Sequence, residues 1–415
     1  MAKAKATPEH KRCRVGLWRG HLTGSIVHGR DCSIPSIEDL AAEMIAVGCR
    51  RVHVLAWRDL DDVDAGGSEV HADHFMRRWA AAGLDITHRT SGAIGQPAAS
   101  ERNGYRVIRR GGRYSVFPRA IAREIASCRE YDALVEVWNG VPWFSPLWCR
   151  KPRITFLHHV HGPMWDQLLP RPLAFIGRGL EARLAPPFYR RTLTLTPSDA
   201  TRDELLHLGF KANHVVAINN GVDERFQPGG QRARKPTITS VGRLAHVKRQ
   251  DRLIDEAVIT KRRVPELQLV IVGEGPLRPV LEQRIDDYGA RDWITLTGTM
   301  SQFELIAQYQ RSWLVVSASL AEGWGLTLTE GAGCGTPAVA TDINGHRSSV
   351  VDGVTGVLVP LERLGDTIAD VLLDDASRQQ LAAGALARAQ TLTWDASAAG
   401  ILRGLHGEVM RRSRA

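Results

Sequence analysis

The sequence lacks the features that mark secreted, membrane-spanning and repetitive proteins. Its six cysteines include no C-x-x-C pair, which argues against a zinc knuckle or a disulfide scaffold and fits a reducing cytoplasm. No run of eighteen apolar residues occurs, so we expect no membrane span. The basic segment 1–14 has no apolar core, so we expect no secretory signal. These absences predict a cytoplasmic globular protein.

Length and charge narrow the protein class further. At 415 residues with 43% hydrophobic content, the chain is long for a single core, so two domains are expected. Its net charge of +9 attracts phosphates, nucleic acids or anionic membranes, although an ordinary arginine-rich composition explains it equally well. The segment Arg171–Arg191 mixes arginine with large apolar residues. It either lies peripherally on the inner face of an anionic membrane or buries Leu180 and Leu184 in its own domain.

Short apolar strands alternate with helical stretches, which predicts an α/β protein with doubly wound parallel sheets. The expected strands are Val52–Trp57, Asp85–His88, Ala133–Val137, Ile154–His158, Thr192–Thr196, Val215–Ile218, Thr237–Val241, Leu267–Val272, Trp293–Leu296, Trp313–Ser317 and Ala338–Ala340. The expected helices include Glu69–Ala82, Asp251–Arg263, Leu277–Tyr288 and Phe303–Gln310. Asn-Asn-Gly and Pro-Gly-Gly interrupt the pattern near 219–235, so we place a domain boundary there.

The most informative segment is 319–337, SLAEGWGLTLTEGAGCGTP. A buried strand precedes it, and its glycines allow a tight turn into a helix that begins near Leu326 and stops at Gly335. Glu322 then lies just before the helix, and Glu330 about one turn inside it. Because the first N–H groups of a helix point outward, we expect both carboxylates to face a cleft that binds an anion and a polyol.

This segment resembles the Glu-x7-Glu motif of the family 4 retaining glycosyltransferases, also called glycosyl transferases group 1. Five other segments match this family in order and spacing: 65–71 (AGGSEVH), 218–228 (INNGVDERFQP), 241–248 (VGRLAHVK), 269–278 (LVIVGEGPLR) and 296–298 (LTG). The resemblance implies the GT-B fold, in which two Rossmann-like domains face a central cleft. It also implies metal-independent transfer of a hexose from a UDP- or GDP-sugar to a hydroxyl group of a glycan, glycolipid or small molecule, with retention of anomeric configuration and no cofactor.

The resemblance begins near Arg51 and ends near Trp394. We therefore divide the chain into an extension (1–45), an acceptor-side domain (46–220), a nucleotide-sugar domain (221–395) and a C-terminal helix (396–415) that packs back on the first domain. Ser36 and the acids after it predict a capped helix in the extension.

Arg243 and Lys248 are the expected ligands of the leaving diphosphate. Both follow an expected strand; arginine offers a bidentate fork to phosphate and lysine a point charge. In resembling enzymes these two positions bind the diphosphate, doing what a metal ion does in other transferases. Gly66 and Gly67 would let the backbone of the opposite domain approach the same phosphates.

The two glutamates of the motif are expected to hold the rest of the donor. Glu330, as in resembling enzymes, would accept hydrogen bonds from the two ribose hydroxyls, and Glu322 would contact hydroxyls of the sugar. The other expected donor contacts are the backbone of Trp324, Gly325 and Leu326 at the sugar, Gly273 at the nucleotide and Thr299 at the base.

A cluster of histidines marks the acceptor side. The segment 156–165 (FLHHVHGPMW) ends an expected strand, and family members carry a histidine at this strand end. Alignment of the strand end favours His161, with His158 and His159 as rivals, so His161 joins Glu322, Arg243 and Lys248 as the expected catalytic residues. Trp138 and Asn139 either line the acceptor cleft or form an aromatic turn that caps the core.

The acidic segment 59–64 (DLDDVD) contains two D-x-D patterns, which bind divalent cations in another transferase fold. Because it directly precedes the glycine loop, we expect it to be a solvated loop and expect no metal requirement.

Two rival functions remain. A phosphorylase would require a pyridoxal phosphate lysine or a phosphate-accepting site, and 45.8 kDa is short for such a relative. A basic membrane- or nucleic-acid-binding protein would require aromatic and basic residues interleaved on one surface, whereas the arginines here are dispersed. We therefore expect a nucleotide-sugar donor, a hydroxyl acceptor and no nucleic acid.

Overall fold

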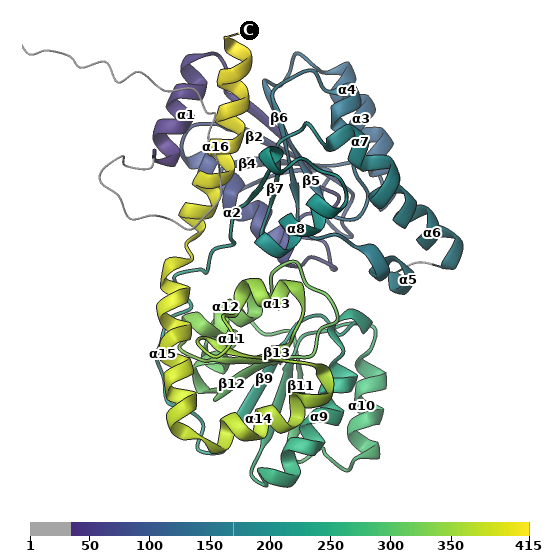
Figure 1. Cartoon of the computed structure of the whole chain (residues 1–415). Helices are drawn as coiled ribbons and strands as arrows, with labels where there is room; N and C mark the ends of the chain where they lie inside the picture. Colours follow the sequence, from purple (N-terminus) through teal and green to yellow (C-terminus); the bar gives the residue numbers. More distant parts are fainter. Residues whose placement is uncertain (1–34, 169, 415) are drawn as a thin grey trace, which may run out of the picture. The chain divides into compact units, whose positions relative to one another are not determined.

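A computed structural model describes residues 35–168 and 170–414 of the chain, which form two parallel β-sheets with helices packed against them (Figure 1). Most of the predicted extension, residues 1–34, lies outside the described residues. The rest of it forms helix α1 (Ile37–Ala46), and the side chain of Ser36 caps this helix by accepting a hydrogen bond from the Asp39 N–H at 3.1 Å. The predicted capped helix is therefore confirmed.

The first sheet has eight strands in the order β3-β4-β2-β1-β5-β6-β7-β8. All neighbours are parallel except β3 and β4. The strands are β1 (Arg51–Leu55), β2 (Asp85–Thr90), β3 (Ala99–Arg102), β4 (Tyr105–Arg109), β5 (Ala133–Trp138), β6 (Arg153–Leu157), β7 (Thr194–Thr196) and β8 (Val215–Ala217). The helices are α2 (Gly67–Ala81), α3 (Val116–Ala126), α4 (Ser145–Trp148), α5 (Trp165–Leu168), α6 (Arg171–Gly179), α7 (Ala185–Tyr189) and α8 (Asp199–His207).

The second sheet has six parallel strands in the order β11-β10-β9-β12-β13-β14. The strands are β9 (Thr237–Val241), β10 (Gln268–Val272), β11 (Ile294–Gly298), β12 (Leu314–Ser317), β13 (Ala338–Thr341) and β14 (Gly356–Val359). The helices are α9 (Gln250–Arg263), α10 (Arg278–Asp287), α11 (Gln302–Arg311), α12 (Leu326–Gly333), α13 (Asn344–Ser349), α14 (Leu364–Leu373), α15 (Asp375–Thr391) and α16 (Trp394–Ser413). The two sheets confirm the predicted α/β class.

Both sheets reverse their strand order at one strand, and this position decides where a ligand can bind. β1 lies between β2 and β5, and β9 lies between β10 and β12. Helices on either side diverge at such a reversal and leave a crevice beyond the carboxyl ends of the strands. The glycine loop follows β1, and the loop carrying Arg243 and Lys248 follows β9. The fold therefore puts two of the predicted phosphate-binding segments at the two reversal points.

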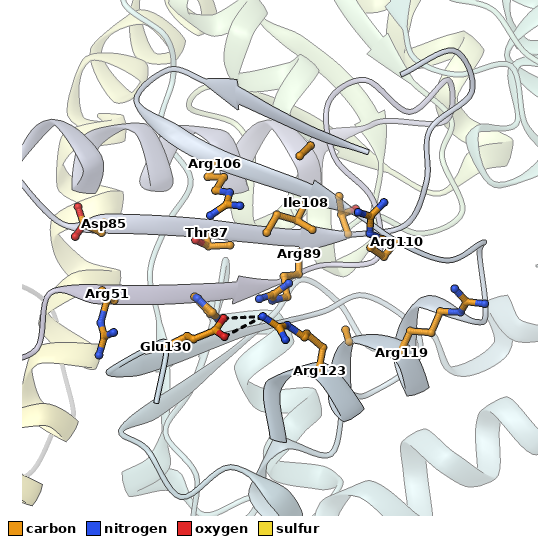
Figure 2. A pocket seen from close by; sticks show the side chains of 14 residues that line it. Arg51, Asp85, Thr87, Arg89, Arg106, Ile108, Arg110, Arg119, Arg123 and Glu130 are labelled. Carbon is orange, nitrogen blue, oxygen red and sulfur yellow. Dashed lines mark hydrogen bonds and ion pairs between the residues drawn. The ribbon is translucent and has the colours of Figure 1, made fainter. Parts of the chain in front are cut away.

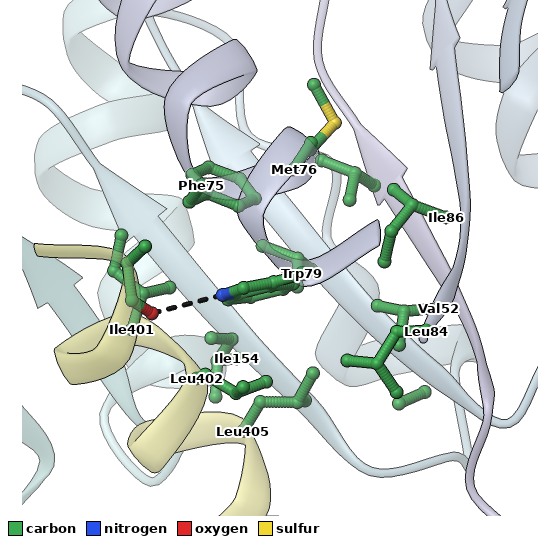
Figure 3. Close-up of a cluster of buried hydrophobic side chains, with 14 of the residues drawn as sticks. Val52, Phe75, Met76, Trp79, Leu84, Ile86, Ile154, Ile401, Leu402 and Leu405 are labelled. Carbon is green, nitrogen blue, oxygen red and sulfur yellow. Dashed lines mark hydrogen bonds between the residues drawn. The ribbon is translucent and has the colours of Figure 1, made fainter. Parts of the chain in front are cut away.

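Helix α16 completes the core of the first sheet, although it follows the second sheet in the sequence (Figure 3). Its apolar side chains pack with α2 and with strands β1, β5 and β6, and the Trp79 indole N–H donates to the Ala398 carbonyl at 3.0 Å. At the start of the helix, Arg78 pairs with Asp395 at 2.5 Å. The residues that α16 buries there include Ile401, Leu402, Leu405 and Val409.

The chain passes from one sheet to the other twice, and the two connecting segments lie side by side. The Val222 N–H donates to the Leu392 carbonyl at 2.9 Å, and Val222 pairs with Thr393 in a parallel bridge. Gly221 permits this approach, since a Cβ on it would lie 2.5 Å from Trp394 Cα. The predicted boundary at 220 and 221 falls in the first of these segments. Among the described residues, no helix combines the length and apolar character that crossing a bilayer requires.

Candidate active site

Lys248 and Glu322 meet beyond the carboxyl ends of β9 and β12. The Lys248 ammonium donates to Glu322 Oε1 at 2.5 Å, and the Ser319 hydroxyl donates to the same oxygen at 2.8 Å. Burial raises the pKa of Glu322, but the Lys248 charge, His346 and these hydrogen bonds outweigh burial and hold the pKa below its usual value. Glu322 is therefore an ionised carboxylate, able to accept hydrogen bonds from a polyol.

Arg243 lies on the same loop as Lys248 but extends toward the first sheet. Its side chain is 46% exposed, and its guanidinium pairs with Asp64 at 2.6 Å. Asp64 belongs to the loop that leads from β1 into the glycine segment. Gly242 lies beside the side chain of Lys248, since a Cβ there would be in ordinary contact with the lysine Cε at 3.4 Å. Arg243 and Lys248 thus lie on one loop, which pairs with Glu322 through the lysine and with Asp64 through the arginine.

The start of helix α12 lies beside the glycine loop. A Cβ on Gly67 would lie 3.1 Å from Leu326 Cδ1, so glycine lets the two helix starts approach without displacing the leucine side chain. Gly66 is the N-cap of α2, and its N–H donates to Glu69 Oε2 at 2.7 Å. Two helix N-termini, each a positive end of a helix dipole, therefore border the same site.

A left-handed glycine sets the turn into α12. Gly325 is the N-cap with a φ of +98°, and a Cβ on it would lie 3.1 Å from the Ser349 hydroxyl. Trp324, just before it, is buried, so any ligand contact at this position is left to its backbone. Contact of a ligand with the backbone of Trp324, Gly325 and Leu326 stays a prediction.

Glu330 lies on the first turns of α12, where Tyr309 of helix α11 donates to its Oε2 at 2.9 Å. Burial raises the pKa of Glu330 to about 7, although the Tyr309 hydroxyl lowers it. The carboxyl group therefore changes its charge near neutral pH. Tyr309 was not predicted, because it lies 21 residues before Glu330 and only the packing of α11 on α12 brings them together.

The three predicted histidines follow β6, and two of them lie beside the turn that carries Glu322. A Cβ on Gly323 would lie 2.6 Å from the His158 carbonyl oxygen and 3.5 Å from His159 Cβ. Burial, together with neighbouring positive charge, lowers the pKa of both His158 and His159 well below the usual value. These two imidazoles are neutral at pH 7, and His159 stacks on His161 with ring centroids 4.3 Å apart.

A buried glutamate positions His161. Glu181, which follows α6, accepts from the His161 N–H at 2.8 Å, from the Gly162 N–H at 2.8 Å and from the Trp165 indole at 3.1 Å. His161 Nδ1 lies 3.7 Å from the same carboxylate. Gly140, with a φ of +87°, lies beside the ring, since a Cβ there would be in ordinary contact with His161 Nε2 at 3.5 Å. Glu181 is a positioning residue that the sequence motifs did not indicate.

The structure corrects one predicted acceptor residue. Trp138 is 1% exposed and packs with Leu157 and Tyr189, and its indole N–H donates to the Gly140 carbonyl at 2.8 Å. It therefore belongs to the core and does not line an acceptor cleft. Asn139, its neighbour, donates to the Ser68 hydroxyl at 2.9 Å and so contacts the first turn after the glycine loop.

The expectation of a solvated loop at 59–64 is wrong for its first acid. Asp59 is 2% exposed, and the guanidinium of Arg109 on β4 forms an ion pair with it at 2.6 Å. Asp61 accepts from Arg109 at 2.7 Å and also pairs with Arg102. Asp62 accepts from the Asp64 N–H at 2.8 Å. These carboxylates neutralise arginines of the first sheet and fold the loop.

The remaining predicted donor residues lie beyond β10 and β11, at the same edge of the second sheet as Lys248. Gly273 has a φ of +137°, its N–H donates to the Gly298 carbonyl at 2.9 Å, and a Cβ on it would overlap the Gly242 carbonyl. Gly273 therefore lets the ends of β9, β10 and β11 pack closely together. Thr299 is exposed directly after β11.

Two protein families match successive parts of the chain. The family described as Glycosyltransferase Family 4 matches residues 65–226, and the family described as Glycosyl transferases group 1 matches residues 222–388. A D-inositol 3-phosphate glycosyltransferase from Frankia alni is 35% identical over 231 residues, which are 49% of this chain and 56% of that relative. The chain thus spans about half the length of this curated relative.

Solved structures identify the fold. The sucrose-phosphate synthase of Thermosynechococcus elongatus superposes with a TM-score of 0.74 at 20% identity, over 88% of this chain and 98% of that one. Anabaena Alr3699/HepE, in complex with UDP and glucose, superposes with a TM-score of 0.68 at 19% identity, over 85% and 98%. The architecture is the GT-B fold of glycosyltransferases. The chain belongs to glycosyltransferase family 4, the glycosyl transferases group 1.

Proposed function

We propose that this chain transfers a hexose from a UDP- or GDP-sugar to a hydroxyl acceptor, with retention of anomeric configuration and without a metal ion. The observation that carries the proposal is that one loop supplies both Arg243 and Lys248, and that Lys248 pairs with the ionised Glu322 on the turn into helix α12. A site with two cations and a carboxylate suits a substrate that joins a diphosphate to a polyol.

The two cations would stabilise the charge that develops on the leaving diphosphate. Arg243 offers parallel N–H donors to phosphate oxygens, and Lys248 adds a localised charge. The positive ends of α2 and α12 act in the same direction, and Gly66 and Gly67 leave the backbone room for the phosphates. Because these groups are fixed before the reaction, stabilising the transition state requires little reorganisation.

Donor recognition would fall to the two glutamates. Glu322 would accept hydrogen bonds from sugar hydroxyls. Because it is hydrogen-bonded to Lys248, binding of the sugar would be coupled to binding of the diphosphate. Glu330 would accept from the ribose hydroxyls in its ionised form. Anabaena Alr3699/HepE, which shares the fold, has been solved in complex with UDP-glucose and with UDP, and this supports a uridine nucleotide as the first donor to test.

The acceptor would approach from the side of the histidines. His161, held by Glu181, would donate from its ring to a sugar hydroxyl or stabilise local charge. His158 and His159, as neutral imidazoles, would shape the site next to the Glu322 turn. The leaving phosphate itself would take the acceptor proton. Among the described residues, the acids of 59–64 already serve arginines or backbone N–H groups, which supports metal independence.

We further propose that helix α6 contacts an anionic membrane surface. Phe175 and Ile176 on this helix are 67% and 54% exposed, and Leu173 is half-exposed. Arg171 and Arg178 lie on the same short helix. Apolar side chains beside arginines match the boundary between acyl chains and anionic headgroups. The alternative in which Leu184 is buried does not fit, since Leu184 is exposed.

A thermal-shift screen with nucleotide sugars tests the main proposal. At least one UDP- or GDP-sugar should raise the melting temperature in the presence of a chelator, because a bound donor stabilises the folded state by mass action. Turnover with that donor should release free nucleoside diphosphate, which a coupled assay detects. A shift that appears only after adding magnesium or manganese would contradict metal independence, and product that forms only with inorganic phosphate would indicate a phosphorylase.

A further inference from the structure

A basic groove lies on one face of the first sheet, separate from the residues of the candidate active site (Figure 2). Its volume is about 800 Å³, within the range of pockets that enclose small organic ligands. Strands β1, β2 and β4 form its floor, and helix α3 forms one wall. Six arginines line it: Arg51, Arg89, Arg106, Arg110, Arg119 and Arg123.

Some of the groove's arginines pair with carboxylates, whereas the others do not. On the floor, Arg89 and His53 both pair with Glu124, which is buried. At the rim, Arg51 pairs with Asp132 at 2.8 Å and Arg123 with Glu130 at 2.9 Å. These pairs account for half of the groove's arginines.

The other three arginines are available to a ligand. Within 35–168 and 170–414, no carboxylate lies within ion-pair distance of Arg106, Arg110 or Arg119. All three are exposed, and Figure 2 shows Arg106 and Arg110 on one side of the groove with Arg119 on the other. A surplus of positive charge on the strand side and the helix side of the groove attracts an anion between them. Guanidinium groups also bind phosphate through paired N–H donors, which makes phosphate the best-matched anion.

The length and lining of the groove narrow the class of ligand. Asp85 and Arg110 mark its two ends along β2 and β4, so it runs for roughly 13–16 Å, the rise of four or five strand residues. Such a length spans more than one phosphate group. The apolar lining is limited to Ala99, Ile108 and Ala120, which is too little for an acyl chain. No Trp, Tyr or Phe is among the lining residues, so bases have no stacking platform.

A segment of the same chain is a poor occupant on grounds of charge. Residues 1–34 contain seven lysines and arginines against two acids, so they repel the groove. A flat anionic membrane would reach the rim of the groove but not its floor.

We propose that this groove is a binding site for a multiply phosphorylated, sugar-sized molecule. Arg106, Arg110 and Arg119 would contact its phosphates, and the polar floor, including Thr87, would face its hydroxyl groups. The groove reaches the carboxyl edge of the first sheet at Arg89 and Arg110, the same edge from which the glycine loop follows β1. The site is distinct from the donor site and does not depend on the proposed transfer reaction.

The test measures binding to the full chain by titration calorimetry. Glucose 1,6-bisphosphate is the probe, and glucose is the uncharged control ligand. The wild type should bind the bisphosphate, and glucose should give no heat. The variant R106A/R119A should weaken binding at least tenfold, since each charge-assisted contact is worth roughly a factor of ten. The control R129A/R403A removes the same charge from exposed arginines that do not line the groove, and its affinity should stay within twofold.

Two further measurements separate this site from its alternatives. In R243A/K248A, bisphosphate binding should persist, whereas R106A/R119A should keep the thermal shift with a nucleotide sugar; the two proposals therefore fail independently. Equal weakening in the groove and control variants would overturn the proposal, as would binding of tripolyphosphate without binding of the sugar bisphosphate. Loss of binding to anionic vesicles in R106A/R119A, with bisphosphate binding unchanged, would identify the groove as a membrane surface and overturn it as well.

Discussion

Lys248 and Glu322 lie 74 positions apart in the sequence, yet the lysine donates to the carboxylate at 2.5 Å. The pair joins the loop after β9 to the turn before α12, so the cation and the acid cannot move independently.

Replacing Lys248 should therefore weaken the binding of both the diphosphate and the sugar of the donor. K248A should lower kcat/KM by about 10²–10³-fold, by analogy with the loss of one fixed donor to a developing oxyanion. Burial without the compensating ammonium should also raise the pKa of Glu322, so the acidic limb of the pH–rate profile should move to higher pH. K248R, which keeps the charge, should retain the wild-type limb. A K248A profile with an unmoved limb would contradict this coupling.

Glu330 should make donor binding depend on pH. Its pKa of about 7 means that the carboxyl group gains its charge between about pH 6 and 8. Donor affinity should rise over this range, because the ionised carboxylate accepts from both ribose hydroxyls. The folded-state pKa lies above the ordinary value of 4.5, so the carboxyl group's contribution to stability is complete below 4.5 and is lost as the pH rises through 7.

E330Q separates these two effects. At pH 8 it should be more stable than the wild type by on the order of 2 kcal/mol, because it has no buried charge to accommodate. At the same pH it should bind the donor weakly and without pH dependence. Titration calorimetry and chemical denaturation at pH 5, 7 and 8 check both effects. A stability difference that is the same at all three values would refute the assigned pKa.

Tyr309 should lower the pKa of Glu330. Its hydroxyl donates to the carboxylate at 2.9 Å and so favours the ionised form. Y309F should move the midpoint of the donor-affinity curve to higher pH while costing about 1 kcal/mol of stability. The measurement is donor Kd against pH, with the wild type in parallel. An unchanged midpoint would mean that the hydroxyl plays no part in the titration.

Gly345 should be needed for the position of Glu322. A Cβ on Gly345 would overlap the Glu322 carbonyl, so G345A must displace the turn that carries the carboxylate. Activity should fall more than tenfold, since small displacements of fixed groups are costly in catalysis. G407A is the matched control: Gly407 is helical in α16 with no atom near the added Cβ, and alanine there should add up to about 1 kcal/mol of stability. Equal activity of the two variants would argue against this role.

The exposed face of α6 should mediate lipid binding. F175S/I176S should reduce sedimentation with vesicles rich in phosphatidylglycerol severalfold and leave turnover of a water-soluble acceptor unchanged, since these side chains are exposed. Vesicles of phosphatidylcholine alone serve as the uncharged control. Undiminished sedimentation of the variant would contradict the proposed contact.

Local sequence signals predicted the second sheet better than the first. The expected helix start near Leu326 is where α12 begins, because glycines, a strand and a helix follow one another without interruption. The β3–β4 hairpin was missed because Ala99–Arg109 is polar and rich in arginine. The signal that would have found it is Asn103-Gly104, a dipeptide favoured in two-residue hairpin turns.

Contacts between segments that are distant in the sequence could not be predicted from such local signals. Nothing near Glu330 indicates Tyr309, and nothing near His161 indicates Glu181; each pair depends on how helices pack. Trp138 shows that a local signal can also favour a position that the fold does not allow. Its neighbours in the sequence are typical of a turn that lines a cleft, but β5 is buried on both faces and the side chain has no exposed side to occupy.

The placement of α16 has a consequence for how the protein is made. The ribosome synthesises all eight strands of the first sheet, then the whole second sheet, and only then the helix that covers Trp79 and Ile154. Until that moment the nascent first half carries an uncovered apolar face, the kind of surface that chaperones bind and that aggregates. Truncation before Trp394 should thus leave the second half able to fold and the first half dependent on a helix supplied in trans.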